Sequence, residues 1–249
     1  YQFTGTLSLY RKQIRNKRAD LFFALHIKSG REDIKMKFVM SYSCGKDSTL
    51  ALHRLIKAGH EPAGLLVMVN RDIKRSWFHG ADDMLLEKFS KSLEIPLLLC
   101  PSKGEDYHLE FEKGLLRAME LGTQMAGFGD IDIENNRRWC QERCDAAGLK
   151  AEFPLWQQGR KKIVEEIITE GYRCIIKSIN NRLLPRDILG KPLDSETVAV
   201  MAARGIDICG ENGEYHTIAV DGPIFKHKLE IQMGEILDFG DRSVIDIKV

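Results

Sequence analysis

A chain of 249 residues with 43% hydrophobic, 29% charged and 8% aromatic residues has the composition of an ordinary globular protein. It is long enough for one α/β domain with a smaller appendage. The formal net charge of +1 gives no support for a nucleic-acid or membrane partner, and no apolar run approaches the ~20 residues of a membrane helix. The six cysteines show no disulfide-scaffold spacing, which indicates reduced thiols and a cytoplasmic location.

Residues 1–35 fit poorly with the rest of the chain. They carry eight Lys and Arg against three Asp and Glu, whereas the remainder carries 29 against 33. We interpret residues 1–35 as an upstream or non-native extension and expect the fold to begin at Met36. A basic leader is also typical of a targeting peptide, but Asp20, Glu32 and Asp33 and the lack of a small-residue cleavage site weigh against that alternative.

The stretch FVMSYSCGKDSTLAL, residues 38–52, predicts a phosphate-binding loop. A short apolar strand is followed by a Ser/Gly loop and then by Lys46, Asp47 and Ser48 at the start of a helix. Small residues let backbone N–H groups approach an anion, the helix N-terminus adds partial positive charge, and Lys46 adds a full one. Asp47 is suited to holding Mg²⁺ against phosphate oxygens.

This loop is not a Walker A motif, because Met40 and Asp47 occupy positions where that motif needs Gly and Ser or Thr. Its Ser-Cys-Gly-Lys-Asp-Ser sequence instead resembles the SGGKDS loop of the PP-loop ATP pyrophosphatases, with Cys44 where that family usually has Gly. The resemblance implies cleavage of ATP between the α and β phosphates, transfer of AMP to a substrate oxygen and release of pyrophosphate. For the loop alone, the alternative is a strand-to-helix turn that happens to contain Gly-Lys.

Apolar runs and helical stripes alternate up to about residue 150. The pattern predicts strands near residues 38–40, 63–69, 95–100 and 122–130, and helices near 46–59, 80–93, 107–121 and 136–147. The expected apolar stripes include Met84 and Phe89 in the second of these helices and Tyr107 and Phe111 in the third. Strand and helix alternation without a hairpin signal is typical of an α/β fold with a doubly wound parallel sheet, here of the HUP/PP-loop type. Ligands bind at the carboxyl ends of such strands.

We therefore expect residues 36–150 to form a PP-loop ATP-binding domain. From residue 151 the pattern loosens, with helices expected at 161–170 and 195–204, a strand at 172–178 and further strands over 218–249. This predicts a smaller, mixed α+β C-terminal lobe over residues 151–249, which we interpret as a substrate lobe.

Further segments resemble the diphthine-ammonia ligase family of PP-loop enzymes, and the resemblance covers about Met36 to Phe225. Besides the loop, the similar segments are SWFH at 76–79, GDI at 129–131 with Arg137, Arg138, Cys144 and PLW at 154–156, LGK at 189–191, and CGENGEYHT at 209–217 with DGPIF at 221–225. Each piece is weak by itself, but their common order makes the resemblance specific.

The resemblance implies an ATP-dependent amidation. A substrate carboxylate attacks the α phosphate to give an acyl-adenylate and pyrophosphate, and ammonia then displaces AMP. In archaea and eukaryotes the substrate is diphthine, a modified histidine of elongation factor two. The implied ligands are ATP, Mg²⁺ and free ammonia, since no glutaminase domain is evident. No membrane partner is expected.

Loop chemistry and resemblance together assign the candidate site. The expected ATP-binding residues are Ser41, Ser43, Cys44, Gly45, Lys46, Asp47, Ser48, Asn70, His79, Gly129 and Asp130. The expected catalytic residues are Lys46, Asp47, Arg137, Glu211, Glu214 and His216, with Asp47 as the metal ligand. Lys46 neutralises the leaving group and Arg137 clamps a carboxylate or phosphate. Whether Glu211, Glu214 and His216 accept a proton from ammonium or bind a second metal stays open.

Each of these residues also has a structural interpretation. Arginines on a helix surface are more often solvated than catalytic, and Glu211-Asn212-Gly213 alone is a turn. Two other functions remain as alternatives. One is a PP-loop enzyme that adenylates another carboxylate or a tRNA base, although the acidic body does not favour a tRNA. The other is a nucleotide-binding sensor without turnover, against which the pairing of Lys46 with Asp47 argues.

Overall fold

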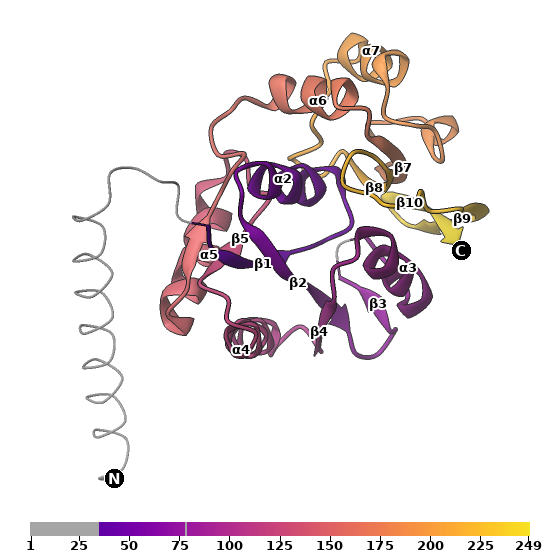
Figure 1. The fold of residues 1–249 in the computed structure, drawn as a ribbon. Coiled ribbons are helices and arrows are strands. Elements are labelled where there is room, and N and C mark those ends of the chain that lie inside the picture. Colours follow the sequence, from indigo (N-terminus) through magenta and orange to yellow (C-terminus); the bar gives the residue numbers. More distant parts are fainter. Residues whose placement is uncertain (1–34, 78) are drawn as a thin grey trace. The chain divides into compact units, whose positions relative to one another are not determined.

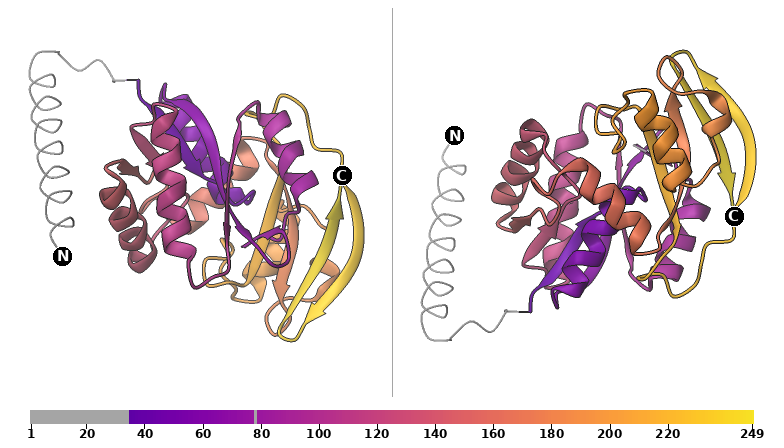
Figure 2. Two further views of the ribbon diagram at one scale, coloured as in Figure 1. Left: turned by 90° about the horizontal axis from the view of Figure 1, so that it is seen from below. Right: turned by 90° about the horizontal axis from the view of Figure 1, so that it is seen from above.

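The structure, a computed structural model, describes residues 35–77 and 79–249 (Figures 1 and 2). The extension predicted over residues 1–35 lies outside the described residues, apart from Lys35. Residues Met36–Val249 form one compact unit. Within the described part of the chain, no helix is both long enough and apolar enough to cross a membrane.

Five parallel strands form the central sheet in the order β4-β2-β1-β5-β6 (Figure 1). They are β1 (Lys37–Ser41), β2 (Glu61–Asn70), β4 (Leu97–Ser102), β5 (Met125–Gly127) and β6 (Lys150–Glu152). The chain builds outward from β1 through β2 to β4 and then continues on the other side of β1 with β5. The predicted α/β fold is confirmed, and the strand order reverses between β1 and β5, where ligands bind in such sheets.

Helices cover both faces of this sheet. The helices α2 (Lys46–Lys57) and α3 (Asp83–Leu93) contribute to one core cluster, whereas α4 (Tyr107–Glu120) and α5 (Glu134–Ala147) contribute to a second. Phe38 and Met40 of β1 belong to the first cluster and Val39 to the second, so alternation along the strand separates the two clusters.

Two local predictions for this sheet were wrong. A short strand, β3 (Arg75–Ser76), pairs antiparallel with the end of β2, and its two residues are too few to leave a hairpin pattern in the sequence. Met84 was expected on the buried stripe of α3 but is 64% exposed. Asp82 caps α3 through the Leu85 amide, and the helix then buries Leu85, Leu86 and Phe89.

The C-terminal lobe is built on a four-stranded antiparallel sheet in the order β8-β7-β10-β9. Its elements are α6 (Arg160–Thr169), β7 (Arg173–Asn180), the 3-10 helix η1 (Arg186–Ile188), α7 (Ser195–Ala203), β8 (Tyr215–Asp221), β9 (Gln232–Phe239) and β10 (Arg242–Lys248). The predicted mixed α+β lobe is thus confirmed. The last group of strands starts earlier than expected, because His216 and Thr217 already belong to β8.

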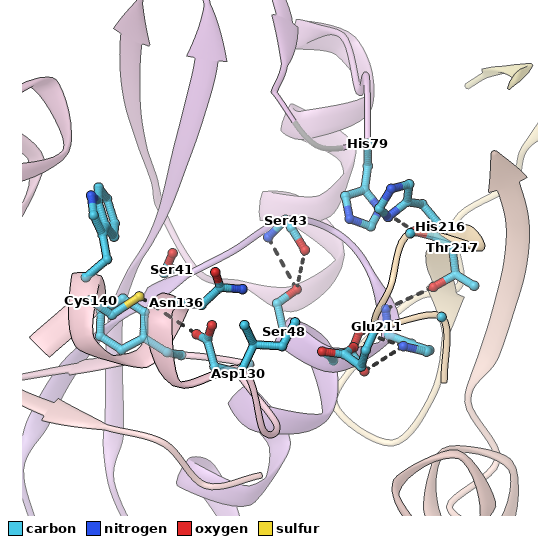
Figure 3. Close-up of a pocket in the computed structure, with 18 of the residues that line it drawn as sticks. Ser41, Ser43, Ser48, His79, Asp130, Asn136, Cys140, Glu211, His216 and Thr217 are labelled. Atoms are coloured by element: carbon cyan, nitrogen blue, oxygen red, sulfur yellow. Dashed lines mark hydrogen bonds and ion pairs between the residues drawn. The ribbon is translucent and has the colours of Figure 1, made fainter. Parts of the chain in front are cut away.

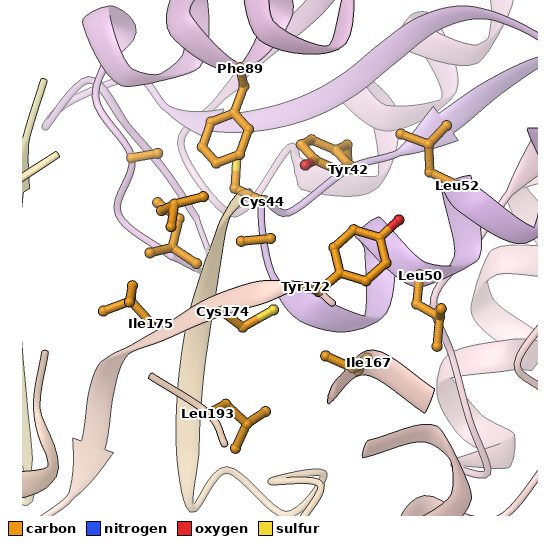
Figure 4. Packing of buried hydrophobic residues seen from close by; sticks show 14 of the residues in the cluster. Tyr42, Cys44, Leu50, Leu52, Phe89, Ile167, Tyr172, Cys174, Ile175 and Leu193 are labelled. Atoms are coloured by element: carbon orange, nitrogen blue, oxygen red, sulfur yellow. The ribbon is translucent and has the colours of Figure 1, made fainter. Parts of the chain in front are cut away.

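The phosphate-loop candidate lies where the two sheets meet. Tyr42 and Cys44 from the loop pack in one buried cluster with Phe89 of α3 and with Cys174 and Ile175 of β7 (Figure 4). The Ala219 amide of β8 donates to the Cys44 carbonyl at 2.9 Å, which joins the C-terminal sheet directly to the loop. The C-terminal sheet therefore helps to shape the site, although it follows the loop by more than a hundred residues.

Candidate active site

A cavity of about 620 Å³ lies at the carboxyl end of β1, and β8 with the loop before it contributes to its wall. Ten residues predicted from the sequence line it: Ser41, Ser43, Lys46, Asp47, Ser48, His79, Gly129, Asp130, Glu211 and His216 (Figure 3). Its volume is in the range of pockets that enclose small-molecule ligands.

The loop before α2 is held by its own hydroxyl groups. Ser43 Oγ lies 3.1 Å from Ser48 Oγ, and the Ser43 amide donates to Ser48 Oγ at 3.3 Å. Gly45 precedes α2 and provides no side-chain cap, so amide groups of the first turn other than that of Lys46, which donates to Thr217 Oγ1, are left for an anion. A Cβ at position 45 would lie 2.5 Å from His79 Cε1, so glycine is required next to this ring.

Cys44 has a φ of 69°, in the left-handed region that favours glycine. Its side chain is fully buried in the core beside Tyr42 and Phe89 and does not line the cavity (Figure 4). The thiol therefore adds no bulk to the cavity, contrary to what its place in the loop suggests. The position is tied into the fold instead, through its carbonyl and Ala219.

Lys46 and Asp47 form the central charge pair. Lys46 Nζ lies 2.7 Å from both carboxylate oxygens of Asp47, and the lysine side chain is only 5% exposed. Burial acts to lower the pKa of Lys46, but the negative groups around it, above all Asp47, outweigh burial and raise the pKa well above its usual value. The Lys46 amide also donates to Thr217 Oγ1 of β8 at 3.2 Å.

Two neutral histidines face the same space. His79 Nδ1 lies 2.5 Å from the Thr217 carbonyl and must carry the proton there, and the rings of His79 and His216 are 5.2 Å apart. Burial, followed by the neighbouring His216, lowers the pKa of His79 to about 3. Burial, together with the cations Arg242 and Lys46, lowers the pKa of His216 to about 4. Both rings are uncharged at neutral pH.

The loop after β5 approaches α2 closely. A Cβ on Gly129 would lie 2.8 Å from the Ser48 amide nitrogen and 2.9 Å from the Asp47 carbonyl carbon, so no side chain fits there. Next to it, Asp130 accepts a hydrogen bond from Cys140 Sγ at 3.8 Å. Burial raises the pKa of Asp130 to about 6, and Asp47 contributes to the shift.

Asp47, Cys209 and Glu211 have ligand atoms within 4.8 Å of one another. Burial raises the pKa of the Cys209 thiol to about 12, so it stays protonated. Burial and then Asp47 raise the pKa of Glu211 to about 7. Two carboxylates beside a cavity fit Mg²⁺, which is commonly held by one or two carboxylates and by substrate phosphates.

Five predicted residues do not line this cavity, namely Cys44 and Gly45 of the loop, Asn70, Arg137 and Glu214. Asn70 closes a turn, because its Oδ1 accepts the amides of Asp72 at 3.0 Å and Ile73 at 3.3 Å. The guanidinium of Arg137, a residue of α5, lies 4.7 Å from the ring centroid of Trp156. Glu214 accepts the Asn212 amide at 3.0 Å. The roles predicted for these side chains, in nucleotide binding and in catalysis, stay predictions.

The sequence did not predict the apolar half of the cavity. Its wall is formed by Tyr107, Phe111, Phe128, Ile133 and Trp139. Tyr107 and Phe111 were read only as the buried stripe of a helix, and nothing in the spacing told a core position from a pocket wall. Their rings lie 5.9 Å and 5.1 Å from that of Trp139. An aromatic compartment thus adjoins the polar loop.

Two family models match the chain. The model described as diphthamide synthase N-terminal domain matches residues 36–151, and the one described as diphthamide synthase C-terminal domain matches residues 159–249. A chain described as a predicted subunit of tRNA methyltransferase from Methanocaldococcus jannaschii aligns with a TM-score of 0.42 and 17% identity, over 78% of this chain and 100% of that one. That score says nothing about what the chain binds.

Curated relatives carry one name. The proteins of Bos taurus and Homo sapiens named diphthine–ammonia ligase are each 25% identical over 234 residues, which is 81% of this chain and 85% of theirs. The Schizosaccharomyces pombe protein of the same name is 23% identical over 86% of this chain and 39% of its own length. Since the two family models together match most of the residues, the chain belongs to the diphthamide synthase family, whose curated members named here are ligases.

Proposed function

We propose that the chain is an ATP-dependent ligase that adenylates a substrate carboxylate and then transfers ammonia to it, releasing AMP and pyrophosphate. The observation that carries this proposal is the pair Lys46 and Asp47 at the uncapped start of α2, inside a cavity that also has an aromatic compartment. Membership of a family of ligases supports it. Binding alone would not require both charges at this place.

ATP fits the two halves of the cavity. We place the adenine in the aromatic compartment, because a flat base stacks on an aromatic ring such as that of Trp139. The triphosphate then lies against the loop from Ser43 to Ser48, where backbone amides and the start of α2 favour an anion. Asp130 lines the same cavity, and we assign it to the ribose hydroxyls.

In the first step the carboxylate oxygen bonds to the α phosphorus, and the bond to the β phosphate oxygen breaks. Lys46 and the amides of the α2 start stabilise the negative charge of the departing pyrophosphate. Asp47 and Glu211 would hold Mg²⁺, which supplies further positive charge against the phosphate oxygens. Holding the like-charged carboxylate and triphosphate in line is the main task of this half of the site.

In the second step ammonia attacks the acyl carbon, and the bond to AMP breaks. A neutral imidazole can accept a hydrogen bond or a proton from the attacking nitrogen, whereas a charged one cannot. We assign this contact to His216, which lines the cavity and is uncharged. The names of the relatives point to diphthine on a protein as the acceptor.

The test measures AMP and pyrophosphate release from ATP with Mg²⁺ and ammonium, with and without diphthine-modified elongation factor two. We expect factor-dependent release that is lost in Lys46→Ala and kept in Lys57→Ala, a matched lysine at the exposed end of the same helix. Release only with other carboxylates would replace the acceptor but keep the chemistry. ATP binding without any α–β cleavage would overturn the ligase in favour of a sensor.

A further inference from the structure

Outside the proposed nucleotide contacts, one arginine joins the two loops that border the cavity. Arg160, the first residue of α6, donates from Nε and Nη2 to the two oxygens of Asp132, at 2.7 and 2.8 Å. Its Nη1 donates to Asp207 Oδ2 at 2.6 Å. Asp132 follows Asp130 by two residues, and Asp207 begins the segment that carries Glu211.

Asp207 in turn shapes the backbone of that segment. Its Oδ1 accepts the Cys209 amide at 3.0 Å, and its Oδ2 accepts the Glu211 amide at 3.1 Å. The same Oδ2 receives Arg160, so one carboxylate oxygen links the guanidinium to the residue that faces Asp47. A shift of Asp207 would therefore move Glu211.

Stability of α6 does not explain this arrangement. A cation at a helix N-terminus opposes the helix dipole, and Arg160 is nevertheless placed there with its side chain 27% exposed. Burial alone would lower the pKa of Arg160, but the hydrogen bonds to Asp132 outweigh it and raise that pKa. The same bonds lower the pKa of Asp132. Arg160 and Asp132 are therefore both charged at neutral pH.

We propose that Arg160 is a positioning residue, which holds the Glu211 segment against the loop after β5 and so sets the distance between Glu211 and Asp47. We call these contacts of Arg160 with Asp132 and Asp207 the Arg160 bridge. The kinetic part of this proposal rests on the proposed function; the structural part does not. A lysine cannot replace the bridge, because a single ammonium cannot reproduce a planar fork that reaches two carboxylates.

The chain offers a matched control in Arg54. Its Nε donates to Glu166 Oε1 at 3.0 Å and its Nη1 to the Pro154 carbonyl at 2.7 Å, so it also joins α2 and α6 through a forked contact. Neither Arg54 nor Glu166 lines the cavity. Loss of this fork reduces stability without moving the Glu211 segment.

Hydrogen exchange of residues 207–214 tests the bridge directly. In Arg160→Met and Arg160→Lys we expect faster exchange of the Cys209 and Glu211 amides, while Arg54→Met leaves them unchanged. Asp132→Asn, which keeps the Asp207 contact, should give an intermediate effect. Unchanged exchange in the Arg160 variants, or equal loosening in Arg54→Met, would overturn the proposal. If Arg160→Met does not fold, Arg160→Lys and Asp132→Asn still decide the question.

Binding of an ATP analogue with a methylene group between its α and β phosphates supplies the second readout. The Mg²⁺ concentration needed for half-maximal binding should rise about 10–100-fold in Arg160→Lys, the range seen when outer partners of metal ligands are lost, and stay constant in Arg54→Met. An unchanged requirement in Arg160→Lys would refute the effect on Glu211. The exchange experiment needs no turnover, so a wild-type protein that forms no AMP would refute the proposed function and leave the bridge testable.

Discussion

We expect Gly129→Ala to disturb the backbone of the candidate site directly. The added Cβ would lie 2.8 Å from the Ser48 nitrogen and 2.9 Å from the Asp47 carbonyl carbon, distances that real Cβ atoms essentially never show. Both atoms belong to the backbone of the first turn of α2, which cannot rotate away as a side chain can. Either this turn or the loop after β5 must therefore shift.

The expected cost has two parts. Overpacking of this kind destabilises a protein by about 1–3 kcal/mol, which lowers the unfolding midpoint by roughly 2–4 °C per kcal/mol for a chain of this size. The displaced amides are also those that we assign to the phosphates, and the loss of one preorganised donor costs a factor of about 10²–10³ in rate. The loss of activity should thus exceed what instability alone explains.

The assay compares the unfolding midpoint, the affinity for Mg²⁺-ATP and AMP release in Gly129→Ala and Gly64→Ala. A Cβ on Gly64 would lie 3.0 Å from Leu98 Cδ1, the end of a flexible side chain that is no part of the cavity. We expect a loss of affinity and rate only in Gly129→Ala. If that variant bound Mg²⁺-ATP like the parent and released AMP at the same rate, the close approach of the two backbones would not matter and our reasoning would be refuted.

Three further predictions concern other parts of the unit. Trp139→Leu should weaken ATP binding by about 1–3 kcal/mol, as measured for lost base stacking, and leave pyrophosphate binding unchanged in titration calorimetry. Cys44→Val should cost about 1–3 kcal/mol in urea unfolding, because a β-branched residue is strained at a φ of 69°, whereas Cys44→Gly should cost less. The hydrogen bonds from Arg54 lower the pKa of Glu166. The pair therefore stabilises the fold above the unfolded pKa of about 4.3 and ceases to do so as the pH falls through the folded value. In Glu166→Gln, the free energy of unfolding should therefore change less with pH in the acid range.

The sequence predicted those parts of the fold that depend on local pattern. Apolar runs and helical stripes were enough for the doubly wound sheet, since β1, β2 and β5 are largely buried and strands alternate with helices along the chain. The edge strand β6 is exposed or half-buried and has no such apolar run. The β2–β3 hairpin and the exposure of Met84 were missed, because one rests on two residues and the other on where Asp82 caps α3. Local features of this kind depend on a few contacts, which the periodicity of apolar residues does not reveal.

The site was predictable where motif and position coincide. Lys46 and Asp47 start the helix that follows β1, and Gly129 follows β5, so the topology alone brings them together at one edge of the sheet. For Glu211 and Glu214 the motif does not predict the position. Both are acidic, lie three residues apart and belong to one motif, so the sequence does not distinguish them. The Asp207 carboxylate turns the Glu211 backbone toward Asp47, while Glu214 folds back onto Asn212.

That choice between the two glutamates rests on contacts that no local pattern contains. Arg160 reaches Asp207 from the start of α6, and Arg242 of β10 donates to the Gly213 carbonyl at 2.9 Å. These two arginines come from separate elements, α6 and β10, and hold both ends of one short segment. Because contacts from other elements hold this loop, the Glu211 carboxylate can stay beside that of Asp47 instead of turning away from it. A site for a divalent cation and a triphosphate requires such an arrangement.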